Sequence, residues 1–205
     1  NWIAACSPHR KDDIRRHLRH GGHRARRPRN TGSGLPPRNR ISIDERPGDG
    51  YARTVGDWEM DAIVGREGKG AMVTLVDGKS GYPLMDKLDE GKQAEPLART
   101  VVRLIKASGL RTSTITTDNG TEFAVHEAIA RELKTTVYFA HPYSPWEKGA
   151  MENAKGLVIQ YIPKQIDFRG VSHRMVRQII NKINNRPRKK NGFYKPLEMI
   201  GKIFL

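Results

Sequence analysis

The chain of 205 residues carries 37 lysines and arginines against 22 aspartates and glutamates, which gives a formal net charge of +15. Its apolar stretches run only a few residues, which excludes a transmembrane helix. Its one cysteine, Cys6, excludes a disulfide framework and a cysteine-based zinc site.

The charge is unevenly distributed along the chain. Residues 1–50 carry +7, residues 51–159 carry −1 and residues 160–205 carry +9. Two basic flanks favour a polyanionic partner such as nucleic acid, because each neutralised phosphate releases counterions. A ribosome-like basic protein is the alternative on charge alone, but it leaves the acids gathered in the centre without an explanation.

A long basic segment precedes the predicted strands. Residues 8–48 are crowded with Arg, His, Gly and Pro, and they hold too few apolar side chains to fold alone, which indicates an arm or linker. Apolar alternation then predicts strands over residues 56–65, 71–77 and 82–88. A turn over residues 77–81 joins the second strand to the third.

Helix and strand signals alternate in the rest of the chain. Helical periodicity predicts four helices and a short closing one, over residues 94–108, 122–133, 151–162, 172–185 and from Pro196. Short β-branched strands are predicted over residues 113–118 and 135–140. Three antiparallel strands followed by alternating units predict an α/β fold, in which helices flank a mixed five-stranded sheet.

Three acids stand where this topology brings distant segments together. Asp61 lies in the first strand, Asp118 ends the fourth, and Glu152 opens the helix after the fifth. Crowded carboxylates need neutralising cations, and Mg²⁺ requires only a few of them plus substrate phosphates, as in phosphoryl transfer. Asp57 and Glu59 share the strand face of Asp61, so the pattern alone neither selects among these acids nor excludes a merely solvated face.

Several longer motifs carry a family resemblance. TTDNGTEF, PYSPWEKGAMENAKGLVIQYIPK and INNRPRKK resemble the signatures of bacterial insertion-sequence transposases of the IS-thirty type. These belong to the DDE superfamily, with a retroviral-integrase-like catalytic core. GDWEMDAIVG resembles the family's first-acid strand, and RNRISIDERP resembles the segment before it. The resemblance covers residues 38–198 and implies an RNase H-like fold.

The resemblance also implies an activity and its residues. It makes Asp61, Asp118 and Glu152 the catalytic and metal-binding acids, with the family's separation of 33 residues between the last two. It selects Asp61 over Glu59 and Asp57, which the strand pattern could not do. It implies a Mg²⁺-dependent DDE transposase, with Mn²⁺ as a substitute metal, that cleaves DNA and transfers strands at the terminal inverted repeats of an insertion element.

Two departures from the family pattern bear on this activity. The family has an upstream helix-turn-helix region, and nothing before Gly56 is long or apolar enough to supply it, so we expect a catalytic core without its specificity domain. Ile159 stands where the family usually has a basic residue, and Met151 stands where it often has Asn. Either Lys155 takes over the contact to DNA, or the chain is a catalytically decayed, transposase-derived DNA-binding protein.

Further residues are predicted to contact DNA. They lie beside the second acid, in the loop and helix around the third, and in the basic loop near the C-terminal end: Asn119, Tyr143, Trp146, Lys148, Lys155, Arg186, Arg188, Lys189 and Lys190. Each has a structural alternative, namely a turn former, rings that lock a loop, or a solvated basic face.

We therefore predict three segments with different tasks. Residues 1–55 form a largely irregular basic arm, residues 56–170 the RNase H-like integrase core, and residues 171–205 a basic helical extension packed on that core. The expected partners are DNA, as element ends and target duplex, and further copies of the chain, because joining two ends needs two active sites. We expect no membrane association and action in the bacterial cytoplasm, at the nucleoid. A plain nuclease of the same fold remains a third hypothesis.

Overall fold

The computed structural model describes residues 37–47, 54–163 and 165–201. The chain divides into two units, residues 1–33 and 34–205, and every described residue belongs to the second. The part of the predicted basic arm before residue 37 therefore lies outside the described residues. In the part of the chain that the structure describes, no helix is long and apolar enough to cross a bilayer.

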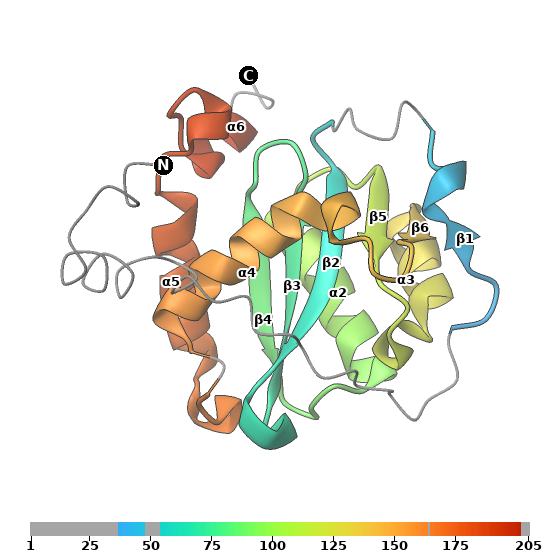
Figure 1. Cartoon of the computed structure of the whole chain (residues 1–205), viewed down its shortest axis with the longest axis horizontal. Coiled ribbons are helices and arrows are strands. Elements are labelled where there is room, and N and C mark those ends of the chain that lie inside the picture. Colours follow the sequence, from blue (N-terminus) through green and yellow to red (C-terminus); the bar gives the residue numbers. More distant parts are fainter. Residues whose placement is uncertain (1–36, 48–53, 164, 202–205) are drawn as a thin grey trace, which may run out of the picture. The chain divides into compact units, whose positions relative to one another are not determined.

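A mixed sheet of six strands forms the centre of the second unit (Figure 1). Its strands are β1 (Ile41–Ser42), β2 (Asp57–Val64), β3 (Ala71–Asp77), β4 (Pro83–Leu88), β5 (Thr114–Thr117) and β6 (Thr136–Phe139). They lie side by side in the order β1-β6-β5-β2-β3-β4. The β2–β3 and β3–β4 pairs are antiparallel, whereas β2–β5, β5–β6 and β1–β6 are parallel.

This architecture confirms the predicted mixed α/β sheet, with one strand more than expected. The five predicted strands correspond to β2 to β6. The additional strand, β1, has two residues, which pair with Tyr138 and Phe139 of β6. A two-residue strand is too short to show alternation, so its sequence does not distinguish it from the surrounding arm.

Helices cover both faces of the sheet (Figure 1). They are α2 (Ala94–Ser108), α3 (His126–Leu133), α4 (Gly149–Tyr161), α5 (His173–Asn184) and α6 (Pro196–Gly201). Helix α2 ends at Gly109, whose φ of 67° suits glycine, as the sequence predicts. The helix predicted from residue 122 begins instead at His126, because Thr121–Phe123 forms a separate 3-10 turn.

The two faces of β2 belong to different layers. Trp58 and Met60 are buried in the larger core, between the sheet and helices α2 and α3. Ile63 points to the opposite face, where a second core includes Leu157 of α4 and Val176 of α5. Successive residues of a strand point to opposite faces, so the acids of β2 lie on the side that α4 covers.

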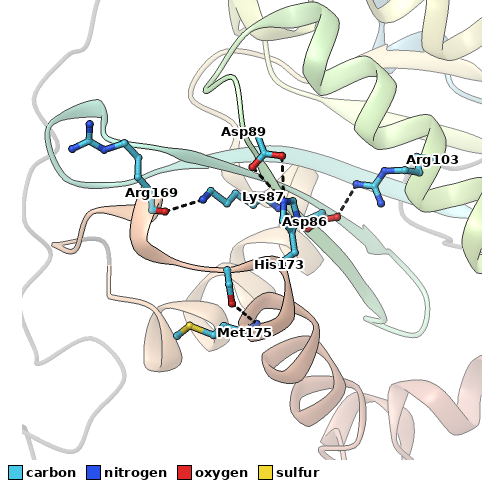
Figure 2. A network of polar contacts seen from close by, with 8 residues as sticks. Asp86, Lys87, Asp89, Arg103, Arg169, His173 and Met175 are labelled. Atoms are coloured by element: carbon cyan, nitrogen blue, oxygen red, sulfur yellow. Dashed lines mark hydrogen bonds and ion pairs between the residues drawn. The ribbon is translucent and has the colours of Figure 1, made fainter.

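A polar network joins helices α2 and α5 to strand β4 (Figure 2). Asp86 of β4 accepts a hydrogen bond from Arg103 at 2.7 Å and contacts His173 Nδ1 at 2.6 Å. The other imidazole nitrogen, Nε2, lies 3.2 Å from both carboxylate oxygens of Asp89. Lys87 donates to the Arg169 carbonyl at 2.8 Å. The network anchors the start of α5 beside the edge strand.

We expect the network to make stability depend on pH. The hydrogen bond to Asp86 raises the pKa of His173, which favours the imidazolium in the folded state. This contribution is complete below the ordinary histidine pKa of about 6.5 and disappears as the pH rises through the higher folded pKa. In urea unfolding between pH 6 and 9, the free energy of unfolding should fall more in the wild type than in His173→Gln. Equal pH dependence in the two proteins would contradict the assignment.

The larger core gives a second prediction. Leu97 of α2 is completely buried against the sheet, so Leu97→Ala should lower the free energy of unfolding by roughly 2–5 kcal/mol. Leu197→Ala is the matched control, because Leu197 is 47% exposed and its truncation should cost no more than about 0.5 kcal/mol. Chemical denaturation measures both, and similar losses would show that the core is wrongly placed.

Candidate active site

Three acids on one face of β2 have different partners. Asp57 accepts hydrogen bonds from the backbone amide and hydroxyl of Thr54 and from the hydroxyl of Thr114, which ties the start of β2 to β5. Glu59 accepts the backbone N–H of Met151 at 2.7 Å, which ties β2 to α4. Asp61 pairs instead with lysine side chains. All three acids are buried, so these partners replace the water that each carboxylate loses.

Two lysines join Asp61 to the other two predicted acids. The ammonium of Lys148 lies 3.8 Å from Asp61 Oδ2 and 3.6 Å from Asp118 Oδ2. The ammonium of Lys155 pairs with Asp61 Oδ2 and lies 3.6 Å from Glu152 Oε1. Asp61, Asp118 and Glu152 therefore surround a shared pair of cations, although they come from three distant segments.

Local structure explains how these acids meet. The parallel pairing of β2 with β5 sets Glu59 opposite Thr116, so the chain leaving β5 emerges beside Asp61. There the Asp118 carboxylate accepts the backbone N–H of Gly120 at 3.0 Å, which holds a tight turn. Glu152 lies in the first turn of α4, where a negative charge is favoured by the helix dipole.

The electrostatics of the site are dominated by this charge pairing. Burial by itself would raise the pKa of Asp61, but the charges of Lys148 and Lys155 hold it below its ordinary value. Burial would likewise lower the pKa of Lys155, but the charge of Asp61 and its hydrogen bond raise it. The pair is therefore ionised in the folded protein at neutral pH.

The carboxylates are donors that suit a hard divalent cation, but two lysine ammonium groups lie between them. Asp118 and Glu152 are 46% and 44% exposed at their side chains, so their oxygens are accessible from solvent, whereas Asp61 is 7% exposed. Carboxylate oxygens are the ligands that Mg²⁺ prefers. Among the residues that the structure describes, no three His, Cys, Asp or Glu side chains have metal-site spacing as they stand. The ammonium groups supply the positive charge between the acids.

Comparison with known proteins shows what this part of the chain is similar to. Residues 52–145 match the family model of the integrase core domain. The matched segment contains Asp61 and Asp118. The transposase for insertion sequence element IS4351 of Bacteroides fragilis is 42% identical over 193 residues, which cover 93% of this chain and 59% of the relative. The transposase InsI for element IS30A of Escherichia coli K12 is 35% identical, over 89% of this chain and 47% of the relative.

A solved structure shows the same fold. The catalytic core domain of BIV integrase superposes with a TM-score of 0.58 at 20% identity, over 73% of this chain and 96% of that one. The predicted RNase H-like fold and the predicted resemblance to insertion-sequence transposases are both confirmed. The chain spans about half the length of the curated relatives that it matches.

The residues predicted around the three acids have distinct surroundings. Asn119 donates to the Ala140 carbonyl at 2.8 Å and accepts from Arg40, so it links the ends of β5 and β6. Tyr143 and Trp146 are 88% and 67% exposed in the loop before α4. Lys148 is buried beside the acids, as described above, so its ammonium faces the site rather than bulk solvent.

The basic loop near the C-terminal end is divided between surface and interior. Arg188 is buried and donates to the Ile183 carbonyl at 3.3 Å, which makes it part of the fold. Lys190 reaches the carbonyl of Gly78 in the turn between β3 and β4. Arg186 and Lys189 are exposed.

One feature of the site, a cleft, was not predicted from the sequence. A cleft beside Asp118 is lined by Arg38, Arg40, Asn119 and His141, among others. His141 joins the loop before α4 to the segment after β1, because it contacts Glu147 at 2.8 Å and Asp44 at 3.0 Å. The motif RNRISIDERP could have pointed to the cleft, because its first residues line it. The cleft forms only when β1 pairs with β6, however, and the sequence does not reveal that pairing.

Removing the Lys155 ammonium should expose the cost of burying Asp61. Lys155→Met keeps the side-chain stem but leaves the carboxylate with fewer positive partners, so the free energy of unfolding should fall by about 3 kcal/mol at pH 7. The double variant with Asp61→Asn should recover most of that loss, because the buried charge is gone. Urea denaturation measures both.

Lys106→Met provides the matched control for that substitution. Lys106 pairs with Glu132 where both side chains are more than half exposed, so its loss should cost no more than about 1 kcal/mol. A Lys155→Met protein as stable as the control would refute the buried pair.

Proposed function

We propose that the chain is the catalytic core of a DNA transposase that cleaves and joins phosphodiester bonds at the ends of an insertion element. One observation carries the proposal: Asp61, Asp118 and Glu152 gather around the ammonium groups of Lys148 and Lys155, and the first two acids lie in the segment that matches the integrase core domain. The names of its curated relatives, which are transposases for insertion sequence elements, support the same conclusion.

Mg²⁺, or Mn²⁺ in its place, is the proposed cofactor, with Asp61, Asp118 and Glu152 as its ligands. When bound, it would activate the attacking oxygen and stabilise the leaving one. Lys148 and Lys155 keep the three carboxylates close together. With a metal bound to Asp61, the ammonium of Lys155 would be available to a DNA phosphate, which is one of the two interpretations that the sequence leaves open.

The proposed reaction consists of two phosphoryl transfers. In cleavage, a water oxygen forms a bond to phosphorus, the bond to the 3′-oxygen breaks, and the water loses one proton while the 3′-oxygen gains one. In joining, that 3′-oxygen loses its proton, bonds to a phosphorus of the target strand and displaces the target's own 3′-oxygen, which gains a proton. Positioning and charge stabilisation account for most of the catalysis of such transfers.

DNA is the proposed partner, and the exposed residues near the acids are its proposed contacts. Tyr143 and Trp146 present rings on which an unpaired base could stack. Arg186 and Lys189 offer charges for the backbone, together with Arg38 and Arg40 of the cleft. Arg188 is not included, because its guanidinium is buried.

The organisation of the chain is proposed as predicted: an arm over residues 1–55, a core over 56–170 and a helical extension over 171–205. We further propose that copies of the chain assemble on DNA in the cytoplasm, at the nucleoid, because joining two ends needs two active sites. The decayed alternative rests on Ile159, and it is disfavoured because all three acids are retained and gathered.

Strand transfer on a pre-cleaved element end tests the proposal. Asp118→Asn should reduce the joining rate with Mg²⁺ by at least about a hundredfold, because one of the charges that organise the reaction is lost. Binding to the same DNA, measured by fluorescence anisotropy, should change less than about twofold. Asp167→Asn is the control, since Asp167 pairs with Arg169 at the surface, and it should join at the wild-type rate. Undiminished joining by Asp118→Asn would defeat the assignment.

A further inference from the structure

Glu59 connects strand β2 to the first turn of helix α4. Its side chain is 2% exposed, and its Oε2 accepts the backbone N–H of Met151 at 2.7 Å. Met151 is itself completely buried, in a small cluster with Val76 and Ala154. The residue that follows it is Glu152, so the hydrogen bond is made by the amide next to a proposed catalytic acid.

The contact satisfies a need of the helix. The first amides of an α-helix have no partner within the helix, and a side chain at the N-cap position usually accepts one of them. The N-cap residue of α4, Lys148, makes no such hydrogen bond. The carboxylate of Glu59 accepts the amide of the third helical residue instead, and its negative charge suits the positive end of the helix.

The same contact determines where Glu152 lies relative to Asp61. Glu59 and Asp61 are two positions apart on one face of β2, a separation of about 7 Å along the strand. Met151 and Glu152 are neighbours at the start of α4. The hydrogen bond that the Met151 amide donates to Glu59 therefore holds Glu152 beside Asp61, where Lys155 already links the two carboxylates.

We propose that Glu59 is a positioning residue, which anchors the first turn of α4 to β2 and thereby places Glu152 for catalysis. The proposal rests on the proposed transposase function, since it gives Glu59 a task in that reaction. It also gives Glu59 a role of its own on this face of β2. Asp61 is a proposed metal ligand, and Asp57 ties the start of the strand to β5.

The C-terminal extension supports this anchor. The ammonium of Lys190 interacts electrostatically with Glu59 and with Asp77, and its Nζ lies 3.3 Å from the Gly78 carbonyl. A buried carboxylate needs such compensation to remain charged. The extension thus contributes a positive charge that acts on the anchoring carboxylate of Glu59.

Three variants of the full chain test the proposal. Glu59→Ala removes the acceptor, and Glu59→Gln keeps an oxygen that accepts the same N–H. Asp57→Ala removes an acid that is also buried, two positions along the same strand, but that contacts Thr54 and Thr114 rather than α4. Two readouts are measured: amide hydrogen exchange at Met151 and Glu152 by NMR, and kcat and KM for strand transfer, per folded molecule.

The expected results separate positioning from general stability. Glu59→Ala should speed exchange of the Met151 amide by about tenfold and lower kcat by about tenfold or more, with KM for the DNA end within about twofold. Glu59→Gln should restore kcat to within about threefold of the wild type. Asp57→Ala should keep the wild-type kcat and Met151 exchange, even if its melting temperature falls.

Three outcomes would overturn the proposal. One is wild-type exchange at Met151 in Glu59→Ala, and another is faster exchange with an unchanged kcat. The third is an equal loss of kcat in Asp57→Ala, which would indicate general destabilisation. A wild-type protein that joins no ends would refute the proposed function instead, while the exchange measurement would still decide whether Glu59 anchors α4.

Discussion

The candidate site depends on one constraint: negative charge buried on one face of β2 must be neutralised or hydrogen-bonded. Asp57, Glu59 and Asp61 all point to this face and all are buried. A buried carboxylate without a partner is strongly destabilising, and the three acids meet this cost in different ways. Hydroxyl and amide groups surround the first, a helix N-terminus meets the second, and two ammonium groups pair with the third. The position of α4 across the sheet follows from the second and third of these contacts.

The charge distribution along the chain has a corresponding explanation in the fold. The near-neutral centre contains the acids of the site together with the lysines that pair with them, so it is neutral because opposite charges meet there. The basic C-terminal segment has two uses. Arg188 is buried and forms a contact within the fold, whereas Arg186, Lys189 and Lys190 are exposed, although Lys190 also reaches the Gly78 carbonyl. The net charge of a segment is therefore larger than the charge that its exposed side chains offer to a polyanion.

Most of the fold could be predicted because its signals are local. Alternation in β2 and β3, the apolar stripe of α2 and the glycine at its end all appear within a few residues of sequence. The two differences arose where local signals are weak, at the two-residue strand β1 and at the 3-10 turn before α3. The site could be predicted only in part, since alternation makes Asp57, Glu59 and Asp61 equivalent, and the choice of Asp61 came from family resemblance.

The sequence by itself determined which residues form strands and helices, which face of β2 is acidic and which domain family the motifs resemble. The backbone imposes these periods on neighbouring residues, so they are visible without a structure. Only the tertiary structure decided which partner each acid meets, because such partners are far apart in the chain: Glu59 and Met151 are separated by 92 positions. Packing of α4 on the sheet, and not any local pattern, distinguishes the acid that holds a helix from the acid that faces the lysines.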